Sequence, residues 1–328
     1  MLIGLNQDND LVHAQYAKES EDYRCPECLC ELILRKGRHT ITHFAHKSNS
    51  ACSNSAMKKE SLEHISSKHH IYAHLNNKVQ VDMEYYLSEI NQIPDIIINK
   101  RLIVEFQYSP INFTLLLSRT EGYHALNMDV KWIGKDVTYS DGMLHLNYFE
   151  AALINCNERT LLTYNPTTQK LIRYEHIQSI DKHLFIANRR VIQWIDLIPH
   201  GERCEVPTFY LTDQAYDEYI SKCKKQRNVL EPTLSILYQA RLLNEKRLDI
   251  IGIIVPEQIY FLTHCITWQA FIYKEIKEGT FSFNKLYRFI KFRSFHFNYS
   301  KMEVLKRAVN TYFTIIQKKA ISRAKSSV

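Results

Sequence analysis

Glycine is scarce in this sequence, and long apolar runs are absent. Only 8 of the 328 residues are glycine, against a usual share of ~7%. Neither G-x-G-x-x-G nor G-x-x-x-x-G-K-[ST] occurs, which excludes the common glycine-rich phosphate loops. No run of 18 apolar residues occurs, so we expect no membrane insertion. The first eleven residues lack a basic segment and carry Asp8 and Asp10, so we predict no signal peptide and a cytoplasmic protein.

Positive charge is concentrated at the end of the chain. The whole sequence carries a formal charge of +7, whereas residues 281–328 hold eleven Lys or Arg against one acid, a local charge of +10. Nucleic acid is the commonest partner of such a basic segment. The alternative is a solvated helical tail.

The pattern of apolar residues predicts a mixed α/β or α+β protein. Short strand-like runs fill the sequence up to about residue 53, and a helix is expected over 57–75. Strands over 79–87, 95–98 and 102–107, a helix over 113–126 and a strand over 129–133 predict a mixed sheet flanked by helices. Beyond short strand-like segments, four helices are expected, and their ranges are 212–227, 233–244, 256–272 and 302–322. We therefore divide the chain into residues 1–55, a small β module, 56–150, the central sheet, and 151–328, a mainly helical and basic region.

A cysteine and histidine cluster in the first module predicts a zinc site. Cys25 and Cys28 form a C-x2-C turn, and His43, His46 and Cys52 follow. Zinc binds four such ligands tetrahedrally, and four protein ligands would make the site structural. The second pair of ligands is either His43 with His46 or His46 with Cys52. A chance C-x2-C or a redox pair is the alternative.

Two acids in apolar surroundings predict a second metal site. Asp95 begins one expected strand, and Glu105 and Gln107 lie two apart on the next, so the latter two share a face. If the turn near Lys100 pairs these strands, the carboxylates of Asp95 and Glu105 converge and suit Mg²⁺ or Mn²⁺. Such an ion supports phosphodiester hydrolysis.

The helix that precedes these strands carries a third acid and two basic groups on one face. Glu60, His64 and Lys68 are spaced four residues apart. Glu60 is a candidate for completing the metal shell, and His64 and Lys68 are candidates for holding a phosphate or a water. A solvated face is the alternative for this helix.

These motifs resemble the competence protein CoiA family. The matching segments are CPEC, KGRHTITHFAHK, KESLEHISSK, EYYLSEINQIPDIII, IVEFQYS and SRTEGYHALNMDVKWI, all within residues 1–135. The resemblance implies a zinc-ribbon-like N-terminal module, a PD-(D/E)XK nuclease-like domain of restriction-endonuclease type, and a role in natural transformation. It also implies that Asp95 and Glu105 are metal ligands, that Glu60 is the first-helix acid, and that Gln107 stands where the superfamily usually has lysine.

Further basic and aromatic residues are candidates for contacts with DNA, for which we favour the single-stranded form. Arg119 and Tyr123 lie four residues apart on the expected helix after the core. Near the end of the chain, basic residues alternate with phenylalanines. This pattern is typical of single-stranded DNA binding, in which bases stack on aromatic rings and basic groups contact phosphates. An aromatic helical core is the competing interpretation. The candidates in this last region are Lys291, Arg293, Lys306, Arg307, Lys318 and Lys319.

Three hypotheses for function follow. The first is a metal-dependent nuclease that processes incoming DNA for recombination, with recombination or DNA-uptake proteins as partners. The second is a non-catalytic DNA-binding or adaptor protein with a degenerate nuclease fold, which Gln107 favours. The third is a zinc-stabilised scaffold whose carboxylates are structural.

Overall fold

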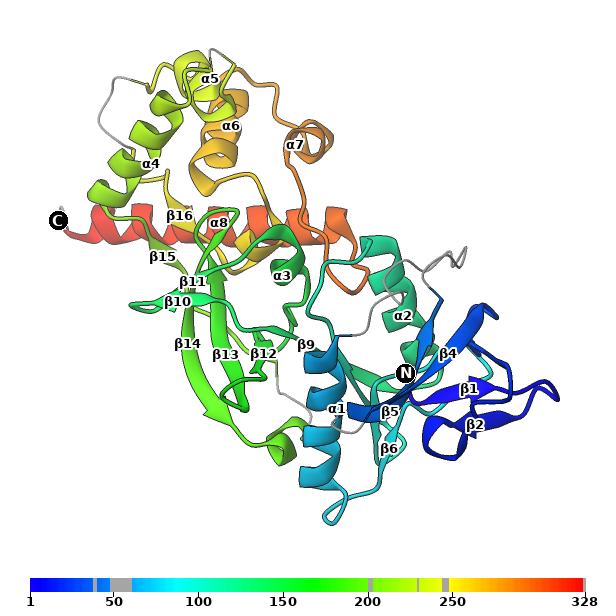
Figure 1. The fold of residues 1–328 in the computed structure, drawn as a ribbon. Coiled ribbons are helices and arrows are strands. Elements are labelled where there is room, and N and C mark those ends of the chain that lie inside the picture. The colour runs from blue at the N-terminus through cyan, green and yellow to red at the C-terminus, as the bar shows by residue number, and fades with distance from the viewer. Residues whose placement is uncertain (38–39, 48–60, 200–202, 229, 244–247, 327–328) are drawn as a thin grey trace. The chain divides into compact units, whose positions relative to one another are not determined.

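The computed structural model describes residues 1–37, 40–47, 61–199, 203–228, 230–243 and 248–326 (Figure 1). By its internal contacts the chain divides into two units. Unit 1 comprises Met1–Asp136, Leu161–Arg173 and Arg190–Gly201. Unit 2 comprises Val137–Thr160, Tyr174–Arg189 and Glu202–Val328.

Unit 1 begins with a five-stranded antiparallel sheet in the order β2-β1-β3-β4-β5. Its small core contains Ala14, Cys25 and the tilted ring pair of Tyr23 and Phe44. The sequence predicted this β module. Its elements are β1 (Ile3–Leu5), β2 (Leu11–His13), η1 (Ala14–Tyr16), β3 (Tyr23–Arg24), β4 (Glu31–Gly37) and β5 (Thr40–His46).

The second sheet of unit 1 contains the expected hairpin. Strands β7 (Ile96–Ile98) and β8 (Leu102–Phe106) pair antiparallel, with Ile96 opposite Val104. The turn places Asn99 and Lys100 at positive φ, which is the geometry of a tight hairpin. The hairpin is flanked by β6 (Val81–Met83) on one side and by the parallel strands β9 (Asp129–Lys135) and β12 (Leu161–Asn165) on the other.

Helices α1 (Leu62–Leu75) and α2 (Phe113–Ala125) pack against this sheet. Ser61 caps α1 by accepting a hydrogen bond from the His64 amide, and Asn112 caps α2 in the same way. Ile71 and Leu75 of α1 pack with alternate residues of β7 and β8, such as Ile96 and Val104. Because side chains alternate along a strand, the intervening residues, Glu105 among them, face α2.

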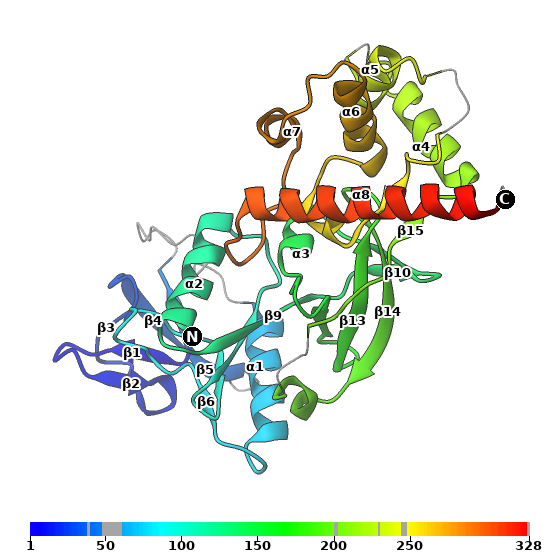
Figure 2. The same cartoon turned by 180° about the vertical axis from the view of Figure 1, so that it is seen from behind.

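Unit 2 combines strands with a helical region, as expected for the last part of the chain (Figure 2). In both views α4 to α7 lie on one side of α8. Strands β13 and β14 contribute residues to both units. The elements with residues in unit 2 are β10 (Thr138–Ser140), β11 (Met143–His145), α3 (Tyr148–Ala152), β13 (Lys170–Ser179), β14 (Leu184–Ile192), β15 (Phe209–Tyr210), α4 (Asp213–Lys225), α5 (Pro232–Gln239), β16 (Ile253–Ile254), η4 (Pro256–Tyr260), α6 (Cys265–Lys277), α7 (Phe283–Phe289) and α8 (Lys301–Ser326).

The expectation of a single helix over 256–272 is wrong. A short 3-10 turn, η4, ends where Phe261 adopts an extended conformation. A new helix, α6, begins at Cys265 because the His264 side chain accepts a hydrogen bond from the Ile266 amide. No helix in the described part of the chain combines the length and the apolar character that a bilayer crossing needs.

Candidate functional site

A pocket of about 460 Å³ in unit 1 gathers most of the candidate site residues that the sequence predicts for the central domain. It lies where the β7–β8 hairpin, α1, α2 and the N-terminal module meet. The charged and polar residues that line it and are used below are Glu27, His64, Lys68, Glu84, Asp95, Glu105, Gln107 and Arg119.

Three groups of the described residues hold Asp95 in place. It comes immediately before β7, and continuing the strand register by one residue brings it level with Glu105 on β8. Its Oδ2 accepts a hydrogen bond from the Phe106 amide at 2.8 Å and lies 2.8 Å from Nε2 of His64. Its Oδ1 lies 3.5 Å from the Lys68 ammonium. Both α1 residues predicted from their helical spacing therefore contact Asp95.

Lys68 forms a buried ion pair that the sequence did not predict. Its side chain is only 2% exposed, and its ammonium donates a hydrogen bond to Glu84 Oε1. The other oxygen of Glu84 accepts a hydrogen bond from the backbone amide of Leu2. Burying a charge is costly unless it is paired, so Glu84 and Asp95 together allow the lysine cation to remain inside the pocket.

Glu105 is held by α2. Its Oε1 accepts hydrogen bonds from Arg119 Nη2 at 2.6 Å, from Arg119 Nε at 3.2 Å and from the Tyr123 hydroxyl. Burial raises the pKa of Glu105 to about 7, although Arg119 opposes the rise and Asp95 adds to it. The described residues donate hydrogen bonds to Oε1 alone, which leaves Oε2 for another ligand.

This arrangement corrects the expectation that Arg119 and Tyr123 contact DNA. Both side chains are buried, and their polar groups are engaged by Glu105. Their spacing of four residues does place Arg119 and Tyr123 on one face of α2. That face is turned inward, and both side chains donate to the Glu105 carboxylate. Both side chains therefore hold the Glu105 carboxylate by hydrogen bonds.

The remaining predicted residues of this site differ in placement. Gln107 lines the pocket, but its side-chain amide donates to the carbonyl of Ser109 at 2.7 Å. Glu60 lies outside the described residues. The pocket thus offers two buried carboxylates, Asp95 and Glu105, whose hard oxygen donors suit Mg²⁺ or Mn²⁺.

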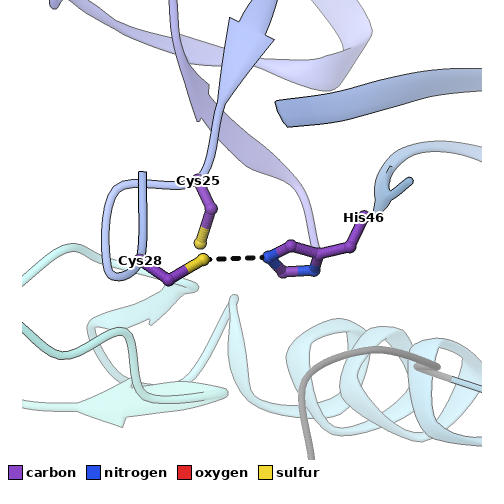
Figure 3. Close-up of side chains that lie close together, drawn as sticks. All are labelled: Cys25, Cys28 and His46. Carbon is purple, nitrogen blue, oxygen red and sulfur yellow. Dashed lines mark hydrogen bonds between the residues drawn. The ribbon is translucent and has the colours of Figure 1, made fainter. Parts of the chain in front are cut away.

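The N-terminal module brings three candidate metal ligands together. The donor atoms of Cys25, Cys28 and His46 all lie within 4.8 Å of one another. Figure 3 shows the two thiols and the ring converging, with Cys28 Sγ 3.2 Å from His46 Nε2. Burial raises the pKa of the Cys25 thiol. Thiolates and imidazole are the ligands that zinc prefers, and a structural zinc site needs a fourth protein ligand beside these three.

The other candidate zinc ligands do not join this cluster within the described chain. His43 is buried on β5, and it is not among the three residues whose donor atoms converge. Cys52 lies outside the described residues. The open choice between these two as the fourth ligand therefore stays a prediction.

The predicted DNA-contacting residues of the last region separate into two groups. Arg293 is buried, donates to the carbonyls of Ile259 and Lys182, and stacks over Phe185. We correct the expectation that it binds DNA, because the aromatic core that competed with that interpretation surrounds it. Four of the others are exposed, and Lys319 is half-buried. The exposed ones are Lys291, Lys306, Arg307 and Lys318.

Two functional candidates were missed by sequence reasoning. Glu84 and Glu27 both line the pocket and are buried. Glu84 stood within a motif used for the family resemblance, and Glu27 lies between the two cysteines of the C-x2-C turn. Their contacts join residues far apart in the chain, and no local spacing reveals such contacts.

Two family models match the chain. Residues 60–198 match the nuclease-like domain of competence protein CoiA, and residues 6–55 match the N-terminal domain of the same protein. The chain therefore has a small N-terminal domain followed in sequence by a nuclease-like domain. The chain belongs to the competence protein CoiA family.

A curated relative supports this membership. Competence protein CoiA of Bacillus subtilis (strain 168) is 28% identical over 184 residues, which are 54% of this chain and 47% of the relative. The match thus spans about half the length of that relative. No solved structure matches the chain.

Proposed function

We propose that the pocket around Asp95 and Glu105 is a PD-(D/E)XK-type site that hydrolyses phosphodiester bonds of DNA with the help of Mg²⁺ or Mn²⁺. We further propose that this activity processes incoming DNA for recombination during natural transformation, in concert with recombination or DNA-uptake proteins. Family membership supports the nuclease-like character of the domain and the link to competence.

The single observation that carries this proposal is the pairing of the β7–β8 hairpin. It brings Asp95 level with Glu105 and lets both line one pocket with a lysine beside them. Buried carboxylates are rare unless they are paired or bind a metal. In the described chain, Glu105 keeps one oxygen without a donor, as a ligand to a metal would require.

Each residue then has a defined task. Asp95 and Glu105 would hold the divalent ion, with Glu60 as the third acid that the family resemblance implies. When bound, the ion would polarise the phosphate and activate water. Lys68 supplies the positive charge that Gln107 lacks, since its ammonium lies 3.5 Å from Asp95 Oδ1. His64 orients Asp95 from the other side.

Charge elsewhere in the chain supports DNA as the substrate. The exposed basic residues of α8 and the segment before it would attract the phosphate backbone in either strand form. We favour single-stranded DNA because aromatic side chains such as Phe292 and Tyr299 lie half-buried in the same region.

The second candidate function is a non-catalytic DNA-binding or adaptor protein. Two observations favour it. Gln107 carries no charge and is bound to Ser109, and Glu105 is engaged by Arg119 and Tyr123 as in a structural ion pair.

A cleavage assay separates the two candidates. Purified protein is incubated with labelled single- and double-stranded DNA in Mg²⁺, Mn²⁺ or EDTA. The nuclease proposal expects cleavage that EDTA abolishes, and it expects Gln107→Lys to preserve or raise the rate. The adaptor proposal expects DNA binding without cleavage in either variant.

A further inference from the structure

One of the two residues between the cysteines of the C-x2-C turn directs its side chain out of the N-terminal module and into the pocket of Asp95 and Glu105. Glu27 stands between Cys25 and Cys28, yet its side chain is only 5% exposed and lines the pocket. Its Oε1 accepts a hydrogen bond from the Ile93 amide at 2.6 Å. Its backbone carbonyl accepts another from the side chain of Asn91 at 3.2 Å. The turn is thus fastened to the segment that leads directly into Asp95.

Arg119 extends this connection to the second carboxylate. Its Nη1 lies 3.5 Å from Glu27 Oε1. Its Nη2 donates to Glu105 Oε1 at 2.6 Å and to the carbonyl of Ile93 at 2.9 Å. One guanidinium therefore ties Glu27, Glu105 and Ile93 together. A shift of Glu27 would break its hydrogen bond with the Ile93 amide, two residues before Asp95. It would also break its ion pair with Arg119, which holds Glu105.

Glu27 also carries an unsatisfied atom. Its Oε2 is buried, and no described residue donates a hydrogen bond to it. A buried carboxylate oxygen without a partner costs free energy, so the surrounding structure must hold the Glu27 side chain in this position. A metal bound by both flanking thiols would hold the turn that carries Glu27.

We propose that Glu27 is a positioning residue that couples the two metal sites, so that metal bound by Cys25, Cys28 and His46 strengthens divalent-ion binding at Asp95 and Glu105. The inference rests on the proposed function for the second site. Zinc fixes the C-x2-C turn, the turn fixes Glu27, and Glu27 fixes Ile93 and Arg119. Such coupling is reciprocal, because each metal changes the affinity of the other site by the same factor.

A thermodynamic cycle tests the coupling in the full chain. Wild type and Glu27→Ala are each prepared with zinc and after zinc removal, with the chelator dialysed away. Mn²⁺ affinity is then measured by electron paramagnetic resonance. The expected result is that zinc removal weakens Mn²⁺ binding of wild type by about fivefold or more. In Glu27→Ala, which keeps its zinc, binding is already weak, and zinc removal weakens it by a smaller factor than in wild type. Equal losses in both proteins would overturn the proposal.

Two further variants control for general damage. Glu31→Ala removes an exposed carboxylate from β4 of the same module, and it should behave as wild type in the whole cycle. Glu27→Gln keeps an acceptor for the Ile93 amide but loses the charge that faces Arg119. It should lie between wild type and Glu27→Ala in Mn²⁺ affinity, which a merely space-filling role for Glu27 would not produce.

Hydrogen–deuterium exchange separates failure of this inference from failure of the proposed function. Faster exchange of the Ile93 amide in Glu27→Ala than in wild type supports the positional link, whether or not any divalent ion binds. Unchanged exchange overturns it. If Asp95→Asn leaves the Mn²⁺ affinity of wild type unaltered, the proposed metal site is wrong, and the exchange data alone decide the link between Glu27 and the hairpin.

Discussion

The ammonium of Lys68 lies 3.5 Å from Oδ1 of Asp95, deep in the pocket of the nuclease-like domain. This cation comes from helix α1. Under the proposed PD-(D/E)XK assignment the lysine would stand at Gln107, just after β8, and Lys68 would supply the missing charge from a different element. This relationship gives the proposed chemistry its positive charge.

Replacing Lys68 should affect stability and activity separately. Lys68→Met leaves Glu84 buried without its partner, so we expect the free energy of unfolding to fall by about 3 kcal/mol. Under the proposed function, cleavage should fall at least ~100-fold, because the positive charge beside Asp95 is lost. Urea denaturation and a cleavage assay measure the two effects.

The double variant separates these effects. Lys68→Met with Glu84→Gln removes both charges and should recover part of the stability, because the Glu84 carboxylate is no longer buried without its cation. Cleavage should stay low. Recovery of cleavage together with stability would show that Lys68 serves only the fold.

Arg119 should matter for folding and for the geometry of Glu105. Arg119→Ala removes the donors to Glu105 and Ile93, and leaving a buried carboxylate unpaired costs about 3–5 kcal/mol. Arg119→Lys should recover only part of this, because one ammonium nitrogen cannot reproduce the contacts that Nε and Nη2 make with Glu105 Oε1 and the Ile93 carbonyl. The measurement is the free energy of unfolding of each variant.

An exposed arginine gives the matched control. Arg101→Ala alters a residue on the surface of the hairpin turn, and it should change stability by no more than ~0.5 kcal/mol. If Arg119→Ala proved equally mild while weakening DNA binding, the surface role first expected for Arg119 would be correct.

We predict one tightly bound zinc, held by Cys25, Cys28, His46 and either His43 or Cys52. Elemental analysis of protein purified without a histidine tag should find it, and Cys25→Ser with Cys28→Ser should lose it. Cys30→Ser is the control, since this cysteine is not part of the described cluster. Loss of zinc should unfold the N-terminal module, because zinc binding supplies local folding energy. Unchanged zinc content in the double cysteine variant would contradict the assignment.

The basic end of the chain should bind DNA through exposed charges. Removing residues 281–328 is unsuitable as a test, since Leu286, Leu305 and Tyr312 are buried in unit 2. The triple variant Lys306→Gln, Arg307→Gln and Lys318→Gln removes exposed charges alone.

We expect this triple variant to bind DNA more weakly and to show a shallower dependence on salt, because fewer counterions are released. Fluorescence anisotropy at several salt concentrations measures both. A matched variant at exposed lysines of α4, Lys224→Gln with Lys225→Gln, should change less. An unaltered salt slope in the triple variant would place the DNA contacts elsewhere.

Local patterns predicted most of the central domain. The hairpin around Asn99 and the helix ending at Leu75 follow from apolar periodicity and turn residues, which act over a few neighbours. These elements also determined that Asp95 and Glu105 would meet. The prediction of one helix over 256–272 was wrong because His264, within an apolar run, caps a new helix that begins at Cys265.

The contacts of Glu27 and Glu84 could not be predicted in the same way. Glu27 reaches Arg119 across 92 residues of chain, and Glu84 reaches Leu2 across 82. Such contacts depend on how the N-terminal sheet and the central sheet of unit 1 pack together. A buried glutamate and a solvated one look alike in sequence, so the interior roles of these acids became visible only in the structure.

The central claim is that Asp95 and Glu105 hold a divalent ion for DNA cleavage, and one comparison tests it most directly. Cleavage of labelled DNA in Mg²⁺ and Mn²⁺ is measured for wild type, Asp95→Asn and Glu105→Gln, with Asp129→Asn and Glu121→Gln as controls at exposed acids of the same domain. We predict cleavage by wild type and both controls, and a loss of at least ~100-fold in the two site variants at unchanged DNA affinity. Equal cleavage by Asp95→Asn and wild type, or no cleavage by any of them, would contradict the account.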